Sequence, residues 1–334
     1  MIGIRFYSGQ GLGNQLWVYA AARAIASYHQ TSLKVFDEHC FKGGQFLSID
    51  YEVDSEISGS DDSTKNKLDE QQVFREQLFY DDQLKHFASA YDQRVEKIKG
   101  DTILEGLFQS EQYFYSGIDK LRHWVRLKEP YLRNSRQYGG LCIINVRGGE
   151  YKRHKSLILP RSYWEAAIDH MQSKYGVKDF LIVTDDTAYA SRLLPRYPVL
   201  KGSVGDCYAA LHGAGYLIVS NSSFSYFPIK TRVDTPPVIA PFLWSRPSNK
   251  HMRWASPANV YQDWLWQSSD GTLVDYQTCL DVATKTVDYY LNEYNVQTTS
   301  ERLLRNQKKL DIAPKKLKQL AKKVLSQLFP MSIG

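Results

Sequence analysis

The N-terminal segment combines a short apolar run, a glycine-rich turn and an alanine-rich stretch, in that order. Residues 1–7, MIGIRFY, are followed by SGQGLG and then by NQLWVYAAARAIA. This order predicts a strand, a tight turn and a helix whose N-terminus presents free backbone N–H groups to an anion such as phosphate. The turn departs from the dinucleotide-binding fingerprint G-x-G-x-x-G, because Asn14 stands at the third glycine and Gln15 follows it. The hypothesis that the protein is a nicotinamide-dependent oxidoreductase is therefore supported by the glycines alone.

Apolar, β-branched runs alternate with helical patterns along most of the chain. The strand-like runs include IGIRFY, SLKVF, GLCIINV, DFLIVT and YLIVSN. This alternation is typical of an α/β protein whose strands are buried on both faces of a sheet. A chain of 334 residues is long enough for two domains, and YGG at 138–140 is the candidate linker. We expect Rossmann-like domains over residues 1–138 and 139–300, followed by a basic amphipathic tail over 301–334.

Charge and cysteine content exclude several classes of protein. Residues 301–334 carry nine Lys and Arg against two Asp and Glu, so the net charge of +6 comes from this tail and the rest of the chain carries −1. The body therefore lacks the basic surplus that nucleic-acid binding requires. No apolar run approaches the length of a membrane span. A reduced, cytoplasmic protein without a metal site is favoured by the absence of C-x-x-C pairs and metal-ligand spacing among the cysteines at 40, 142, 207 and 279.

Two polar segments are open to more than one interpretation. Residues 54–72 contain only two aliphatic side chains and are either an exposed loop or disordered. In the tail, Leu317, Leu320, Val324 and Leu328 form an apolar stripe flanked by lysines. This stripe could make a peripheral contact with an anionic membrane surface, or it could close the fold as a packed helix with its lysines in water.

Arg147 follows one of the strand-like runs directly. It comes after CIINV and is followed by two glycines. Because open α/β sheets bind ligands at the carboxyl ends of their strands, this position favours a ligand site. A guanidinium there can hold a phosphate through two parallel hydrogen bonds. The alternative is a surface salt bridge.

Two further strand-like runs end in residues that can form hydrogen bonds to a ligand. Asp185 and Asp186 follow DFLIVT, where they could accept hydrogen bonds from a ribose or a guanine, or one of them could cap the next helix. A helix start needs only one short polar side chain, and more than one follows YLIVS, so we expect a pocket for an anion or a nucleotide there. The side chains concerned are Asn221, Ser222, Ser223 and Ser225.

Five motifs occur in a fixed order over roughly residues 9–230: GLGNQLW, LEGLFQSEQYF, NVRGGEY, FLIVTDD and SNSSFSYF. Together they resemble the motifs of the α-1,2-fucosyltransferases of glycosyltransferase family eleven. The resemblance implies a GT-B-like α/β architecture in which two Rossmann-like domains face a central cleft. It implies an inverting, metal-independent transfer of L-fucose from GDP-fucose to a hydroxyl of an acceptor glycan, as in the synthesis of bacterial surface polysaccharides. GDP-fucose is then a substrate, and no cofactor is expected.

The resemblance also assigns roles to individual residues. Arg147 falls on the arginine associated with the donor phosphates, and Gly13, Asn14 and Gln15 fall on a Gly-Asn-Gln at the edge of the cleft. The nucleotide is expected, on the C-terminal domain, near Asp185, Asp186, Asn221, Ser222, Ser223 and Ser225. The acceptor is expected on the other side, near Gln109, Glu111 and Tyr151.

The chain departs from the family's His-x-Arg-Arg-Gly-Asp-Tyr pattern. The histidine is Asn145, the second arginine is Gly148 and the aspartate is Glu150. Paired tryptophans after the serine-rich loop are replaced by Tyr226 and Phe227. These changes leave two alternatives open, a different GDP-deoxysugar as donor and a protein that binds a sugar nucleotide or a glycan without catalysis.

A general base must accept the proton of the acceptor hydroxyl, and we expect Glu150 in this role. A positioned carboxylate or histidine contributes about 10²–10⁴-fold to such a step. Glu111 and His154 are the other candidates. If Glu150 is not the base, it is a structural carboxylate that orients Arg147.

Overall fold

The computed structural model describes residues 1–52, 72–81, 86–153, 157–242 and 260–293. His154, the basic tail at 301–334 and all but the last residue of the polar segment at 54–72 lie outside the described residues. The interpretations of these segments, the peripheral membrane contact included, therefore stay predictions, as does the cytoplasmic location. Among the described residues, no helix combines the length and apolar character that crossing a bilayer would need.

The N-terminal unit is built on a parallel sheet with the strand order β2-β1-β7-β4. Helix α1 (Leu12–Tyr28) connects β1 to β2, so the strand, glycine turn and helix expected from the sequence are confirmed. Because β1 lies between β2 and β7, the direction in which strands are added reverses between β1 and β7. The strands are β1 (Ile2–Arg5), β2 (Leu33–Phe36), β4 (Gln72–Arg75) and β7 (Thr102–Glu105).

The C-terminal unit contains a larger sheet with the strand order β10-β9-β11-β12-β13-β14, parallel except for the last pair. Here the order reverses between β9 and β11. The strands are β9 (Cys142–Val146), β10 (Phe180–Thr184), β11 (Tyr216–Val219), β12 (Val238–Pro241), β13 (Leu265–Gln267) and β14 (Leu273–Val274). The helices are α4 (Arg161–Tyr175), α5 (Thr187–Leu193), α6 (Val204–Gly213), α7 (Tyr226–Lys230) and α8 (Tyr276–Glu293). Two parallel α/β units confirm the predicted fold class of paired Rossmann-like units.

Short elements lie in the loops of the two units and in the chain between them. Two antiparallel pairs are β3 (Leu47–Ile49) with β8 (Val125–Leu127) and β5 (Leu78–Asp81) with β6 (His86–Ser89). The short helices are α2 (Leu121–Trp124), α3 (Glu129–Ser135), η1 (Glu38–Cys40), η3 (Gln93–Lys97), η4 (Glu111–Tyr113), η5 (Tyr115–Lys120), η6 (Arg136–Tyr138) and η7 (Gly149–Arg153). Helix α3 packs against α6, so the chain is already in contact with the second unit before the boundary expected at residue 138.

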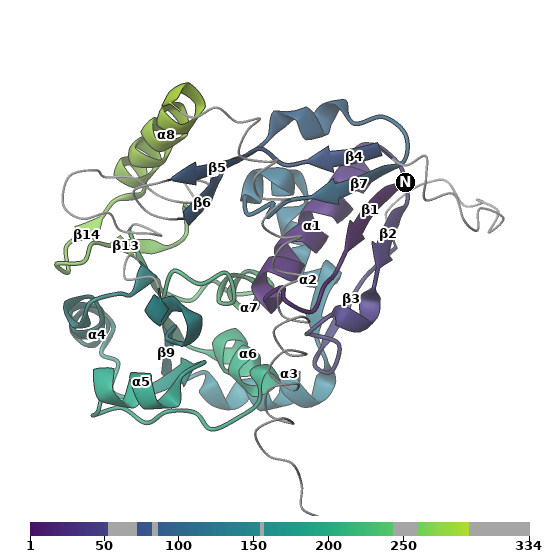
Figure 1. The fold of residues 1–334 in the computed structure, drawn as a ribbon. Coiled ribbons are helices and arrows are strands. Elements are labelled where there is room, and N and C mark those ends of the chain that lie inside the picture. The colour runs from purple at the N-terminus through teal and green to yellow at the C-terminus, as the bar shows by residue number, and fades with distance from the viewer. Residues whose placement is uncertain (53–71, 82–85, 154–156, 243–259, 294–334) are drawn as a thin grey trace, which may run out of the picture.

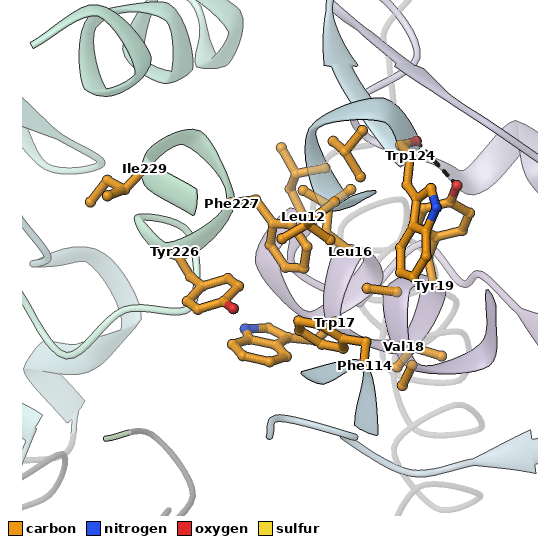
Figure 2. Packing of buried hydrophobic residues seen from close by; sticks show 14 of the residues in the cluster. Leu12, Leu16, Trp17, Val18, Tyr19, Phe114, Trp124, Tyr226, Phe227 and Ile229 are labelled. Atoms are coloured by element: carbon orange, nitrogen blue, oxygen red, sulfur yellow. Dashed lines mark hydrogen bonds between the residues drawn. The ribbon is translucent and has the colours of Figure 1, made fainter. Parts of the chain in front are cut away.

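The two units share one aromatic core. Figure 1 shows α1 and α7 side by side between the sheets, and these helices are in contact. The Trp17 ring lies 4.2 Å from the Tyr226 ring and 5.6 Å from the Phe227 ring, measured between centroids. Figure 2 shows both α7 rings pointing toward α1. Aromatic pairs of this kind contribute about 0.5–1.5 kcal/mol each beyond the burial of their surface, so α1 fixes the position of α7.

Gly13 allows α1 to approach the loop that precedes α7. A β-carbon at Gly13 would lie 2.5 Å from the carbonyl carbon of Ser223 and 2.6 Å from its carbonyl oxygen. Backbone atoms cannot rotate away as the end of a side chain can, so any larger residue must separate the helix from the loop. Gly9, in the same turn, has open space where a β-carbon would be.

We predict that Gly13→Ala lowers the free energy of unfolding by about 1–3 kcal/mol, because the added methyl group is forced into the backbone of the loop. The matched control Gly9→Ala should change it by no more than about 0.5 kcal/mol. Urea denaturation of the two variants measures the difference. Equal stabilities would show that the helix and the loop are not held in contact in solution.

Candidate functional site

The candidate site lies where the carboxyl ends of the two sheets meet. In the C-terminal sheet the strand order reverses between β9 and β11, and Arg147 and Ser220 are the first residues after these strands. Such a reversal is the usual ligand position of an open α/β sheet. In the N-terminal sheet the reversal lies between β1 and β7, and the loops that follow carry the glycine turn and Gln109.

Asn14 joins the two reversal points. Its Oδ1 accepts one hydrogen bond from Nε2 of Gln109 and another from Oγ of Ser223, both at 2.8 Å. One amide oxygen at the start of α1 therefore connects this helix with the loops that follow β7 and β11. The sequence predicts Asn14 and Ser223 beside the donor and Gln109 beside the acceptor, and the structure brings the three into one network, called here the junction.

Gln15 is turned away from the junction. Its side chain is buried, its Nε2 donates to the carbonyl oxygen of Cys40 at 2.8 Å, and its Oε1 accepts from the backbone N–H of Lys42 at 2.9 Å. Backbone groups thus occupy both ends of the amide. Gln15 holds the loop after β2 against α1, and its effect on a ligand passes through the position of that helix.

Arg147 is held between two carboxylates. Its Nη1 lies 2.6 Å from Oδ2 of Asp185, and its Nη2 donates to Oε1 of Glu150 at 3.0 Å. The guanidinium also lies over the Tyr151 ring, 5.2 Å from its centroid, a contact worth about 0.5–1 kcal/mol at an accessible site. The side chain of Arg147 is 28% exposed, whereas that of Glu150 is 69% exposed. A ligand anion could reach Arg147, but it would compete with these carboxylates.

Asp185 determines the shape of the turn after β9. Its Oδ1 accepts the backbone N–H of Gly148 at 2.9 Å, while its Oδ2 faces Arg147. A β-carbon at Gly148 would lie 2.7 Å from the Tyr189 ring and 2.9 Å from Cβ of Asp186. Gly148, which stands at the second arginine of the family-eleven pattern, therefore has no room for a side chain unless Tyr189 and Asp186 move.

Asp186 caps the following helix. Its Oδ1 accepts the backbone N–H of Tyr189 at 3.0 Å, and its Oδ2 pairs with Nζ of Lys152. The hydrogen bond from Lys152 is the main reason why the pKa of Asp186 is lowered, and the helix N–H adds to it. Asp186 is therefore the helix cap, Asp185 is the partner of Arg147, and the expected hydrogen bond from a ribose or a guanine to this acidic pair stays a prediction.

The serine-rich loop is internally bonded. Oγ of Ser225 donates to the carbonyl oxygen of Ser222 at 3.0 Å, and Nδ2 of Asn221 donates to the carbonyl oxygen of Leu157 at 3.2 Å. Most of its polar groups thus hold the loop in shape. Behind it lies a small, mostly apolar cavity of about 20 Å³, with room for about one water molecule. The aromatic part of its wall consists of Tyr226, Tyr261, Trp264 and Trp266.

Tyr151 lies with the C-terminal strand ends, although the resemblance assigns it to the acceptor. Its hydroxyl donates to the carbonyl oxygen of Asn221 at 3.1 Å. Burial raises the pKa of Tyr151 to about 12, so the hydroxyl stays protonated and keeps donating at neutral pH. Tyr151 therefore links the turn that carries Arg147 to the serine-rich loop.

Glu111 forms a buried ion pair that crosses between the units. Its Oε1 lies 3.0 Å from Nζ of Lys230 and accepts the hydroxyl of Tyr226 at 2.7 Å. Lys230 also pairs with Asp263 at 2.6 Å and lies over the Tyr261 ring. Burial raises the pKa of Glu111, an effect that the nearby ammonium opposes. The side chains of Glu111 and Lys230 are only 14% and 11% exposed, so the pair is poorly screened by water.

Lys230 is a site residue that sequence reasoning missed. In YFPIK it ends an apolar run, a position that usually places a lysine in solvent. No motif distinguishes it there, because its partners come from η4 and from residue 263.

Among the described residues, no group of three or more His, Cys, Asp or Glu side chains is arranged to hold a metal ion.

Comparison with known proteins yields similarities of fold. No protein-family model matches the chain, and no curated protein matches it. Among solved structures, POFUT1 in complex with GDP is 10% identical, with a TM-score of 0.41, over 72% of this chain and 97% of that chain. In another crystal form of POFUT1 with GDP, the chain spans 54% of that structure's length, with a TM-score of 0.31.

Two further solved structures are similar at the same level. The glycosyl transferase family 9 protein from Veillonella parvula DSM 2008 is 10% identical over 85% of this chain and 96% of that chain, with a TM-score of 0.44. A mutant of Arabidopsis thaliana FUT1 in complex with GDP is 11% identical over 71% of this chain and 70% of that chain, with a TM-score of 0.41. At such identities the likeness concerns the fold alone.

We predict that Lys230→Met lowers the free energy of unfolding by about 3 kcal/mol, because it leaves Glu111 buried without its cation. Arg161→Met is the control, since Arg161 pairs with Glu165 on the surface of α4 with both side chains about half exposed. Its loss should cost less than about 0.5 kcal/mol. Urea denaturation at neutral pH measures both. A small cost for Lys230→Met would mean that water reaches the Glu111 carboxylate.

Proposed function

We propose that the chain is a glycosyltransferase that uses a GDP-sugar donor. The observation that carries this proposal is Arg147, a partly exposed guanidinium at the strand-order reversal of the C-terminal sheet, within a set of motifs in family order. The best donor candidate is GDP-fucose, and the acceptor is a hydroxyl of a glycan, with an α-1,2 linkage as the first expectation. These specific points rest on the sequence motifs of family eleven.

The proposed donor site uses two sources of positive charge. One is Arg147, and the other is the N-terminus of α1, where the N-cap Gly11 has no side chain to occupy the first N–H groups. Both suit a diphosphate, because a helix N-terminus and a guanidinium stabilise the same kind of anion. The sequence contains no Asp-x-Asp, and we propose that these groups do the work that a metal ion would do on the departing diphosphate.

In the proposed reaction the acceptor oxygen attacks the anomeric carbon as the bond from that carbon to the diphosphate oxygen breaks, with inversion. GDP leaves with the electron pair, and the acceptor proton passes to a base. Of the three candidate bases, Glu111 is held by Lys230 and Tyr226, and His154 lies outside the described residues. Glu150 is exposed beside Arg147 and stays the proposed base.

A binding protein without catalysis is the second candidate. It is favoured by the two carboxylates that already hold Arg147 and by the missing space at Gly148. Thermal-shift titration with GDP and a panel of GDP-sugars, followed by transfer assays on a glycan panel with EDTA, separates the candidates. Sustained transfer would exclude the binding protein. Binding without transfer would exclude the enzyme, and transfer from a different GDP-deoxysugar alone would correct the donor.

We predict that Arg147→Ala lowers kcat for transfer by about 10²–10³-fold, because the lost interaction strengthens as charge develops on the leaving diphosphate. The control Arg161→Ala removes an arginine from the exposed face of α4 and should keep the wild-type rate. Steady-state kinetics with the donor found in the titration measure both. Near-wild-type turnover of Arg147→Ala would move the phosphate site elsewhere.

Glu150→Gln distinguishes a base from a carboxylate that only orients Arg147. Glutamine keeps an oxygen that can accept from Nη2 of Arg147, but it cannot take up a proton from the acceptor. We therefore predict a fall in kcat of about 10²-fold with little change in donor affinity. Unchanged kcat in this variant would assign Glu150 the orienting role alone.

A further inference from the structure

Glu76 is a buried carboxylate that no motif singled out. It follows β4 directly and is 2% exposed. Its Oε2 accepts the backbone N–H groups of Leu107 at 2.6 Å and of Phe108 at 2.8 Å, and its Oε1 accepts the hydroxyl of Tyr113 at 2.8 Å. Three donors thus converge on one carboxylate from the chain that follows β7.

The chain around Glu76 is shaped to receive it. A β-carbon at Gly106 would lie 2.4 Å from Cβ of Glu76, so this loop can pass over the carboxylate only with glycine at 106. Phe108 has a φ of +48°, in the left-handed region that non-glycine residues rarely adopt. Its N–H bond to Glu76 helps to hold that conformation. The loop therefore depends on Glu76 for its path.

The residues fixed by Glu76 flank those that cross to the C-terminal unit. Gln109 comes directly after Phe108 and donates to Asn14, which also binds Ser223. Glu111 lies between Phe108 and Tyr113, and it pairs with Lys230. The ion pair of Glu111 and the bond from Gln109 to Asn14, which itself binds Ser223, thus both lie between two residues that bond to one carboxylate.

The surroundings of Glu76 allow its carboxylate to take up a proton near neutral pH. Burial raises its pKa from 4.5 to about 7, an effect opposed by the bonds from Phe108, Tyr113 and Leu107 and increased by the charge of Asp92. Asp92 is itself paired with Arg94, and the exposed pair Arg75–Glu105 lies on the neighbouring strands. The folded state thus takes up the proton at a higher pH than the unfolded chain, and this group lowers stability as pH rises from about 4.5 to about 7.

Protonation changes how Glu76 can bond. The carboxylate accepts from all three donors, and hydrogen bonds to an ionised acceptor are roughly twice as strong as neutral ones. The protonated acid must donate from one oxygen. The Tyr113 oxygen can accept that proton if its own O–H turns to the carbonyl oxygen of Ala90, which lies 3.4 Å away. The bonds to Leu107 and Phe108 then lose their charge assistance, but the larger cost of burying the charge is also removed, so the net effect of protonation is to favour the closed loop.

We propose that Glu76 is a positioning residue of the junction, which holds the loop at 107–113 so that Gln109 reaches Asn14 and Glu111 reaches Lys230 in the C-terminal unit. Its effect on sugar transfer rests on the proposed function, whereas its effect on the loop does not. Glu76 acts through the backbone of the loop and not through contact with a substrate.

The test compares the wild type with Glu76→Gln over a range from about pH 5.5 to about pH 8.5. Glutamine has the same size and keeps one acceptor oxygen, but it cannot ionise. The control is Glu105→Gln, because Glu105 is exposed and pairs only with Arg75 among the described side chains. Hydrogen exchange of the full-length proteins, corrected for the intrinsic effect of pH, reports the loop directly. Donor kinetics report its consequence.

In the wild type and in Glu105→Gln, protection of the 106–114 segment should fall about tenfold as pH passes 7, because Glu76 ionises more readily once an opened loop exposes it to water, and kcat/KM for the donor should fall with it. In Glu76→Gln both steps should disappear, because the side chain cannot ionise. A wild type without a step in exchange, or a Glu76→Gln variant that keeps it, would overturn the proposal. The wild-type series needs no variant to fold. If no protein transfers sugar, the proposed function fails while hydrogen exchange still decides the role of Glu76.

Discussion

Close packing of α1 against the chain that leads into α7 is the contact on which the rest of the structure depends. Trp17 contacts Tyr226 and Phe227, and Gly13 brings the backbone of α1 to Ser223. Each sheet alone places its loops at its own carboxyl edge. This contact lies where the two edges face one another, so that the polar bonds of the junction can form across them. Burial of apolar surface holds α1 against the chain that leads into α7, and the weaker hydrogen bonds of the junction determine how the two are aligned.

The electrostatics of Arg147 follow from the same arrangement. Asp185 holds both the guanidinium and the backbone of the turn, which orders the arginine before any ligand arrives. Binding of a ligand to Arg147 then costs little side-chain entropy, but the ligand must compete with a nearby carboxylate. Asp185 therefore orders Arg147 but also reduces the positive potential of the site. The exposed Glu150 adds less to this competition, because water screens it.

The sequence predicts those parts of the fold that depend on local order. The strand, turn and helix at the N-terminus, the alternation of strands and helices, and Arg147 at a strand end follow from patterns within a few residues. The partners of Glu111 and the role of Gln15 could not be predicted, since they depend on contacts over distances that no local pattern encodes. Glu76 resembles any glutamate after a strand, and only the path of the loop after β7 shows that it is buried.

The crowded surroundings of Gly148 also constrain how this site could change. A side chain there would meet the ring of Tyr189, whose own backbone N–H is bonded to Asp186 at the start of α5. Because Cβ of Asp186 also lies only 2.9 Å from the added β-carbon, a second arginine could enter only together with a shift of the start of α5. A side chain at 148 is thus coupled to the position of α5, and a single substitution that introduces the second arginine would give a less stable protein. Laboratory evolution toward a more cationic site would be expected to use other positions on the turn first.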